Sequence, residues 1–289
     1  AANGVILITT KKGTATEGKV RTQLSSTYTF DTPSIYMDWQ NQYGQGSAGQ
    51  FAYKDGKGGG VNDGYDQSYG PLMNGQLIPQ FDSPVVNGVR QATPFIPHPD
   101  NVSSFFNTGH QFLNTYAVSG GTETANGRIS IGDTQIEGVI PDNTFRNQTG
   151  TLAGQFHLGK LQTSGSVQYI RSDAHNRPQE GYNTSILEQF IWFGRQVDLQ
   201  ALKDAYFKGL TGADNNGPSS REYNWNYSYH NNPYWLQYSN PLQDGPDRLI
   251  GGWSASYNYA PGTDASLRTS ADVYRYNINQ QLAPGDVRQ

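Results

Sequence analysis

The sequence contains no cysteine, which excludes a disulfide framework and any metal site built on thiolates. It has no basic excess either: the net charge is −4, whereas a nucleic-acid-binding domain needs a basic face, so no nucleic-acid partner is expected. No apolar run approaches the roughly 20 residues of a transmembrane helix. Charged residues make up only 15% of the chain, against a typical ~25%. A helical membrane protein and an ordinary charged soluble domain are therefore both poor descriptions.

Glycine, tyrosine and uncharged polar residues take the place of the missing charge. The 34 glycines and 19 tyrosines are typical of a β-protein with many turns. The same profile is typical of an outer-membrane β-barrel, because its strands are apolar on one face only and keep the mean hydropathy low, here −0.68. The composition leaves a soluble β-protein and a membrane barrel both open.

An alternation of apolar and polar residues is the dominant pattern along the chain. In its first instance, Leu24, Tyr28 and Phe30 alternate with Gln23 and Thr29. Most alternating segments are about ten residues long, which matches the ~9–11 residues of a membrane-crossing strand better than the ~5–6 of a soluble one. The seven predicted strands cover residues 20–30, 111–119, 128–135, 146–158, 161–171, 249–259 and 265–276.

Each predicted strand has one apolar face, which a barrel turns toward lipid, and one polar face, which it turns toward its lumen. The apolar faces consist of Val20, Thr22, Leu24, Ser26, Tyr28 and Phe30; Phe112, Tyr116 and Val118; Ile129 and Ile131; Leu152, Phe156 and Leu158; Leu161, Val167 and Tyr169; Trp253, Ala255, Tyr257 and Tyr259; and Leu267, Ala271 and Val273.

The predicted connections differ in length in a regular way. Tight turns follow residues 119, 158 and 259, residues 137–145 form a moderate loop, and long loops cover about residues 31–110 and 172–248. Short turns on one side and longer loops on the other are typical of an outer-membrane barrel, with periplasmic turns and extracellular loops. A soluble antiparallel sandwich is the alternative, but it does not sort its connections by side.

The long loops contain signals for short helices. Residues 185–195, "SILEQFIWFGR", are strongly apolar, and Asp198 is placed to cap a helix over residues 199–208 that Gly209 ends. In the first long loop, a short helix is predicted near residues 38–43.

No motif in the chain indicates catalysis, a cofactor or a metal. Gly44, Gly46 and Gly49 have the spacing of a dinucleotide loop, but no strand precedes them and no helix follows, so we interpret them as part of a loop. The five histidines are dispersed, and the calcium-like fragments "NDGYDQ" and "DNNG" lack the terminal glutamate, which favours turns. The chain is predicted not to be an enzyme.

An aromatic cluster is the most informative feature of the second long loop. Its members are Tyr223, Trp225, Tyr227, Tyr229, Tyr234, Trp235 and Tyr238, and Asn224, Asn226 and Asn231 lie among them. Such rings stack on sugars or peptide groups, and the asparagines could hydrogen-bond the same ligand. Partner contact or packing within the loop, and an aromatic girdle at the membrane interface, are the two alternatives.

The chain opens in the middle of an apolar, strand-like run, "AANGVILITTKKG". Further distinctive segments are "NQYGQG" (41–46), "SYGPLMNGQLIPQFDS" (68–83), "PHPDNVSSFFNTG" (97–109), "NTYAVSGGTETANGRIS" (114–130), "GVIPDNTFRNQT" (138–149), "FIWFGRQVDLQALKDAY" (190–206), "NPYWLQY" (232–238) and "DRLIGGWSASY" (247–257). In this order, and over nearly the whole chain, they resemble the SusC/RagA family of TonB-linked outer-membrane transporters.

The resemblance implies a large barrel filled by a plug, of ~22 strands in transporters of this type. Residues 1–13 then correspond to the end of the plug, residues 14–18 to the plug–barrel junction, and residues 19–289 to the first part of the barrel wall. Seven strands cannot close around a plug, and open sheet edges cannot face lipid. We therefore expect the chain to be a fragment of a longer protein.

By the same resemblance, the parent protein imports oligomeric nutrients, either glycans or oligopeptides, across the outer membrane of a Bacteroidetes-type bacterium. A SusD-like surface lipoprotein lids the barrel, the TonB complex pulls on the plug, and the barrel wall contacts lipid. Two alternatives stay open. One is a secreted, soluble glycan-binding β-protein that uses the aromatic cluster, and the other is a TonB-dependent receptor for iron chelates or vitamins, without the lid.

Overall fold

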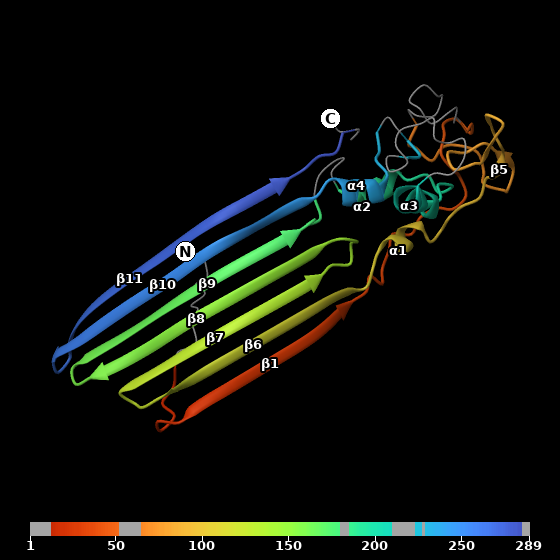
Figure 1. Cartoon of the computed structure of the whole chain (residues 1–289). Coiled ribbons are helices and arrows are strands. Elements are labelled where there is room, and N and C mark those ends of the chain that lie inside the picture. The colour runs from red at the N-terminus through yellow and green to blue at the C-terminus, as the bar shows by residue number, and fades with distance from the viewer. Residues whose placement is uncertain (1–12, 52–64, 180–184, 210–222, 227–228, 285–289) are drawn as a thin grey trace.

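The computed structural model describes residues 13–51, 65–179, 185–209, 223–226 and 229–284. Its main element is a single-layered antiparallel sheet of seven strands (Figure 1). In sheet order, which is also chain order, the strands are β1 (Val20–Asp31), β6 (Gly109–Gly121), β7 (Ala125–Glu137), β8 (Thr144–Leu158), β9 (Leu161–His175), β10 (Leu242–Ala260) and β11 (Thr263–Gln280). All seven predicted strands are confirmed, and within the described residues the sheet is open, with β1 and β11 as its edges.

The strands extend beyond their predicted ends, most of all at the start of β10. Gly245 and Pro246 interrupt the alternation there, and a proline cannot donate to a ladder. On the β9 side these two residues have no partner, whereas on the β11 side they pair with Asn277 and Tyr276. β10 therefore continues past the proline through pairing on one side.

All three tight turns lie at one end of the sheet, and the long loops leave from the other end (Figure 1). Gly159 and Gly262, in two of the turns, have φ angles of 60° and 78°. Glycine adopts this left-handed conformation without the steric cost that a Cβ would add. The predicted sorting of the connections by side is confirmed.

The register places the predicted apolar faces of all seven strands on one side of the sheet. One line of directly paired residues on this side consists of Leu24, Tyr116, Ile131, Gly150, Tyr169, Leu249 and Val273. The other side is polar, as in the paired Ser130, Thr151 and Gln168. Within the described residues nothing covers the apolar side, where Leu24 is 76% exposed and Leu152 is 55% exposed.

The long loops fold together at the end of the sheet opposite the tight turns. We call this unit the loop domain, made of the described parts of residues 32–108, 138–143 and 176–241. Its elements are the strand pairs β2 (Leu77–Ile78) with β5 (Thr93–Pro94) and β3 (Val85–Val86) with β4 (Val89–Arg90), and the helices α1 (Asn101–Phe105), α2 (Ile186–Trp192), α3 (Leu199–Lys208) and α4 (Pro233–Ser239).

Both helices predicted in the second long loop are confirmed as α2 and α3, and the side chains of Ser185 and Asp198 cap them by accepting N–H groups of the first turn. The helix predicted near residues 38–43 is wrong. There the Gln40 side chain accepts the N–H of Tyr43 and donates to its carbonyl, which replaces helical hydrogen bonds. No helix in the described part of the chain is long and apolar enough to cross a membrane.

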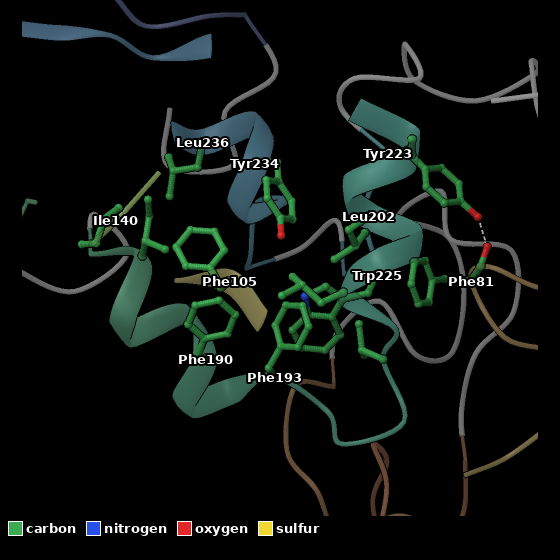
Figure 2. Packing of buried hydrophobic residues seen from close by; sticks show 14 residues of the cluster. Phe81, Phe105, Ile140, Phe190, Phe193, Leu202, Tyr223, Trp225, Tyr234 and Leu236 are labelled. Carbon is green, nitrogen blue, oxygen red and sulfur yellow. Dashed lines mark hydrogen bonds between the residues drawn. The ribbon is translucent and has the colours of Figure 1, made fainter. Parts of the chain in front are cut away.

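The hydrophobic core lies in the loop domain rather than against the sheet (Figure 2). The Phe105 ring of α1 lies 5.1 Å from Phe190 of α2 and 5.4 Å from Tyr234 of α4, measured between centroids. Ile140, from the connection between β7 and β8, joins the same cluster. Truncation of one buried aromatic ring to alanine typically costs ~3–5 kcal/mol, so this core holds the loops in a defined arrangement.

Candidate functional site: the loop domain and the faces of the sheet

The aromatic cluster of the second long loop lies mostly inside the loop domain. Tyr223, Trp225, Tyr234 and Trp235 are buried, Tyr238 is half-buried, Tyr229 is exposed, and Tyr227 lies outside the described residues. The alternation of these rings does not correspond to a strand, because residues 223–226 are irregular and α4 begins at Pro233. Of the three interpretations, the structure therefore favours packing within the loop for the buried members.

The buried rings use their faces and polar atoms on neighbours within the loop domain. Trp225 is 1% exposed, packs edge-on against Phe193 at 5.2 Å and stacks on His230 at 5.2 Å with an interplanar angle of 11°. The Tyr223 hydroxyl donates to the carbonyl of Phe81 (Figure 2). The bond from Tyr223 to Phe81 joins the second long loop to the first.

Tyr229 is the member of the described cluster that is available to a ligand. Its ring is 50% exposed, while its backbone N–H donates to Asn226 Oδ1 at 2.9 Å and is thereby held in place. By contrast, burial raises the pKa of Tyr234 to about 12, so its phenol stays protonated and shielded. Among the described rings of the cluster, the ring of Tyr229 is therefore the one placed to contact a ligand.

The asparagines predicted to bond a ligand instead hold the loop together. Asn224 accepts the N–H of Trp225 at 2.8 Å and donates to the carbonyl of Asn226 at 2.7 Å. Asn226 in turn donates to the carbonyl of Tyr65, and Asn231 is buried as well. Buried amides must find partners wherever the fold offers them, and here the nearest partners belong to the loops.

His230 is the polar centre of the loop domain, and the dispersed spacing of the histidines gave no sign of it. The imidazole is 2% exposed, with Nε2 3.0 Å from Asp66 Oδ2 and Nδ1 2.8 Å from the side-chain amide of Gln189. It stacks between Trp225 and Trp192. Burial lowers the pKa of His230 and outweighs the opposing influence of Asp66, so the ring is neutral at neutral pH.

The loop with dinucleotide-like glycine spacing is tightly packed. A Cβ on Gly44 would lie 2.3 Å from the Phe95 ring, which excludes larger residues. The adjacent Gln45 exchanges two hydrogen bonds with Gln196, of 2.8 and 2.9 Å. Gly44 therefore serves close packing between the two long loops, whereas Gly49, with a φ of 74° and no atom within 4 Å of a Cβ, serves a turn. No group of three or more His, Asp or Glu side chains in the described residues is arranged to hold a metal ion.

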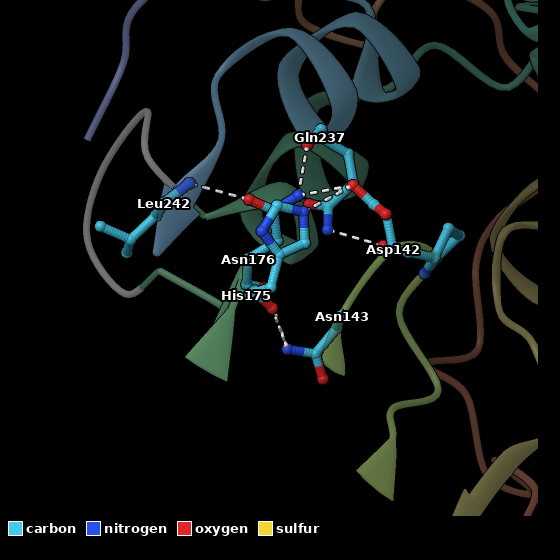
Figure 3. Close-up of polar contacts among 7 residues, drawn as sticks. Asp142, Asn143, His175, Asn176, Gln237 and Leu242 are labelled. Atoms are coloured by element: carbon cyan, nitrogen blue, oxygen red, sulfur yellow. Dashed lines mark hydrogen bonds and ion pairs between the residues drawn. The ribbon is translucent and has the colours of Figure 1, made fainter. Parts of the chain in front are cut away.

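A second polar network ties the loop domain to the sheet (Figure 3). Asn176, directly after β9, donates through its side-chain amide to Asp142 Oδ2 at 2.7 Å and to the Gln237 carbonyl at 3.1 Å. Its Oδ1 accepts the N–H of Leu242 at 2.9 Å, and its carbonyl accepts a bond of 3.0 Å from Asn143. Its φ of 49° is a conformation that asparagine tolerates better than most residues.

The segment before β1 approaches the sheet at the end with the tight turns. The N–H groups of Thr16 and Gly18 donate to the Gly121 carbonyl at 3.0 and 3.1 Å. Gly13 lies so close to Asn126, on the polar side of the sheet, that a Cβ there would be 2.7 Å from Asn126 Oδ1. Residues 1–12, which contain most of the predicted plug segment, lie outside the described residues.

A line of polar residues crosses the apolar side of the sheet at one level on all seven strands. On β7 to β11 the apolar residues end at this line, whereas on β1 and β6 Tyr28, Phe30 and Phe112 lie beyond it. Just beyond the line from Leu24 to Val273, toward the loop domain, the next line is polar on every strand and consists of Ser26, Asn114, Asp133, Gln148, Arg171, Asp247 and Arg275. We call it the polar line. A boundary shared by five neighbouring strands marks a change of environment rather than a local feature.

No protein-family model matches the chain, and the search of curated proteins gives no significant match.

Proposed function

We propose that the chain forms part of the wall of a transmembrane β-barrel, as the first barrel strands of a SusC/RagA-type, TonB-linked importer in the outer membrane of a Bacteroidetes-type bacterium. The importer moves oligomeric nutrients, glycans or oligopeptides, and breaks no bond in them. Residues 1–13 then belong to its plug and residues 14–18 to the plug–barrel junction.

The continuous apolar band on one side of the sheet carries this proposal. On β8 the band runs from Gly150 to Leu158, which is about 27 Å along the strand at ~3.4 Å per residue. With the ~35–45° tilt of barrel strands it is about 20 Å tall, close to the ~25 Å apolar band of outer-membrane barrels. A soluble protein rarely leaves an apolar surface of this extent uncovered.

The open edges of the sheet favour a larger barrel over an isolated sheet. Among the strands that the structure describes, β1 and β11 each have one side without a neighbour. In hydrocarbon the N–H and C=O groups of such edges would lack partners, at a cost of several kcal/mol each. In the membrane both edges would therefore pair with further strands, and the polar side would line the lumen.

The position of the loop domain supports an extracellular role for it. The long loops and the tight turns lie at opposite ends of the sheet, as extracellular loops and periplasmic turns do in outer-membrane barrels (Figure 1). On this model the loop domain, with the exposed ring of Tyr229, faces the substrate and a SusD-like lipoprotein. The segment around Gly13 enters from the periplasmic end on the lumen side, where a plug would be within reach of the TonB complex.

The soluble glycan-binding alternative has weaker support. It relies on the aromatic cluster, and four of the six described members are buried in the loop core. It also leaves the apolar band without a function. A receptor for iron chelates or vitamins would share the barrel and the plug, and it differs in having no lipoprotein lid.

Fractionation of the source bacterium tests the proposal, with the purified complex as a second step. We expect the protein to stay in the outer-membrane pellet after a high-salt wash, to co-purify with a surface lipoprotein, and to bind members of a panel of oligosaccharides and oligopeptides. Release by salt would contradict the membrane assignment. Retention without a lipoprotein, together with binding of an iron chelate, would favour the receptor instead.

A further inference from the structure

Two arginines on the polar line face outward, and their guanidinium groups form few hydrogen bonds within the protein. Arg171 of β9 and Arg275 of β11 both lie opposite Asp247 of β10, so they are about 10 Å apart at the ~4.8 Å spacing of neighbouring strands. Within the described residues Arg171 has no hydrogen-bond or ion-pair partner, and Arg275 donates one bond, to Asn277 Oδ1 at 3.1 Å. Their guanidinium groups are thus available to an anion.

The neighbouring carboxylates on this side of the sheet have partners within the protein, and Asp173, two residues from Arg171 on β9, accepts a 3.2 Å bond from Gln243. Asp133 forms an ion pair of 2.8 Å with Arg146, and Asp247 accepts a 2.9 Å bond from the Tyr169 hydroxyl. The Asp247 carboxylate stays between the two arginines and opposes a small free anion there. An anion at this place needs a further source of affinity.

An apolar hollow on the same side of the sheet offers that source. Its floor is a line of paired glycines, and it is closed by the Trp253 ring, with a volume of about 740 Å³. The residues that form it include Gly120, Gly127, Gly154 and Gly165 on the floor and Leu152, Phe156, Val167 and Trp253 at the sides. Because glycine has no side chain, this strip is recessed between taller apolar rows.

The hollow lies at the depth that lipid tails reach. Gly165 precedes Arg171 by six residues on β9, which is about 20 Å along the strand. With the tilt of ~35–45° this becomes about 15 Å of depth, which is half of the ~30 Å hydrocarbon core of a bilayer. A lipid whose phosphate is at Arg171 therefore has the ends of its acyl chains at the hollow.

We propose that this strip of the sheet binds a phosphate-bearing membrane lipid. Arg171 and Arg275 hold the headgroup phosphate through charge-assisted hydrogen bonds, and an acyl chain lies along β9 and β10 into the hollow beside Trp253. The inference rests on the proposed membrane location. The occupant is a lipid rather than free phosphate. The Asp247 carboxylate repels a free anion, and burial of the acyl chain in the hollow compensates for this repulsion.

Fluorescence of Trp253 tests the site directly. The protein in detergent micelles is titrated with a phosphatidic acid whose acyl chains are brominated near their ends, since bromine quenches nearby indoles. We expect saturable quenching that the Trp253→Phe variant loses. Diacylglycerol with the same brominated chains should need about tenfold more lipid for half-maximal quenching, and glycerol 3-phosphate should not compete.

Three variants make the result specific. The double variant Arg171→Gln/Arg275→Gln should bind phosphatidic acid about tenfold more weakly, like diacylglycerol. Gly154→Leu should fill the hollow and reduce the quenching, and its new Cβ has room, since the nearest atom is 3.7 Å away. Arg268→Gln, on the lumen side of β11, is the matched control and should bind like wild type.

Equal quenching by phosphatidic acid and diacylglycerol in the wild-type protein would overturn the headgroup site, and so would a double variant that behaves like the control. Competition by glycerol 3-phosphate would reassign the arginines to a soluble phosphate compound. These outcomes are separate from failure of the proposed function, which would appear as release of the protein from the outer-membrane pellet.

Discussion

The Nε2 atom of His230 lies 3.0 Å from Oδ2 of Asp66, although the two residues are 164 positions apart in the sequence. Asp66 belongs to the first long loop and His230 to the second, and both side chains are buried. Gln189 of α2 completes the contact on the other ring nitrogen. This contact links the first long loop to the second through buried side chains.

Replacement of His230 should loosen the loop domain without affecting the sheet. His230→Ala leaves the Asp66 carboxylate buried without its partner and opens a cavity beside Trp225, at a combined cost of about 2–4 kcal/mol. Limited proteolysis followed by mass spectrometry should show faster cleavage in the loops and unchanged protection of the strands. Tyr229→Ala, one residue away but exposed, is the control, and equal cleavage in both variants would contradict the role of His230.

The stability of the loop domain should fall in mild acid. The unfolded histidine has a pKa near ~6.5, and burial lowers the pKa of His230 in the folded loop. Between these two values the unfolded chain binds more protons, so stability decreases as the pH falls through about 6.5 and levels off below the folded pKa. Hydrogen exchange of loop amides at about pH 7.5 and about pH 5.5, corrected for intrinsic rates, measures the change. His230→Gln should reduce this dependence; an undiminished one would assign it to other groups.

The two sides of the sheet should respond differently to a new charge. Leu152→Arg places a guanidinium in the apolar band, where a lipid-facing arginine near the midplane costs ~2–4 kcal/mol. Ser166→Arg places it on the polar side of the neighbouring strand. Folding into lipid vesicles, followed by gel mobility with and without heating, should give a much lower yield for Leu152→Arg. Similar yields would show that the apolar side does not face lipid.

Trp225 and Tyr229 should separate loop packing from ligand contact. Trp225→Ala removes a ring that is 1% exposed and should destabilise the loop domain by about 3–5 kcal/mol. Tyr229→Ala should change stability by less than about 0.5 kcal/mol and, if its ring meets substrate, weaken oligosaccharide or oligopeptide binding. Thermal unfolding and calorimetric titration of the purified complex provide the two readouts. Unchanged substrate binding in Tyr229→Ala would remove the last described member of the cluster from the substrate site.

The strands could be predicted because each has two faces in different environments. In β1, for example, Leu24 and Tyr28 lie on the apolar face and Gln23 lies on the polar face, so the sequence alternates. Their ends could not, because the ladder continues where the alternation has stopped, most of all at the start of β10. Gly245 and Pro246 were placed in the second long loop, and only the pairing with β11 shows that the strand passes through them.

The structure of the loop domain could be predicted from the sequence only to a much smaller extent. Asn232 and Pro233 form a helix start that the rules of capping describe, but the helix α4 that follows them was not predicted. The burial of Trp225 depends on Phe193 and His230, and that of His230 on Asp66 in the other loop. Such contacts depend on tertiary structure, so no local pattern distinguishes a ring that binds a ligand from a ring that packs.

The pairing of the strands has a consequence for the order of assembly. β6 to β9 are joined by short connections, as are β10 and β11. These strands can therefore pair with their neighbours without the closure of a long loop. The pairs Asp31 with Gly109 and Gln243 with His175 instead bring together residues separated by an entire long loop, and closing such loops carries an entropic cost. The loop domain bridges both of these seams. Collapse of the loop domain would bring the ends of β1 and of the β10–β11 hairpin close to their partner strands, so the loop core would also promote assembly of the sheet.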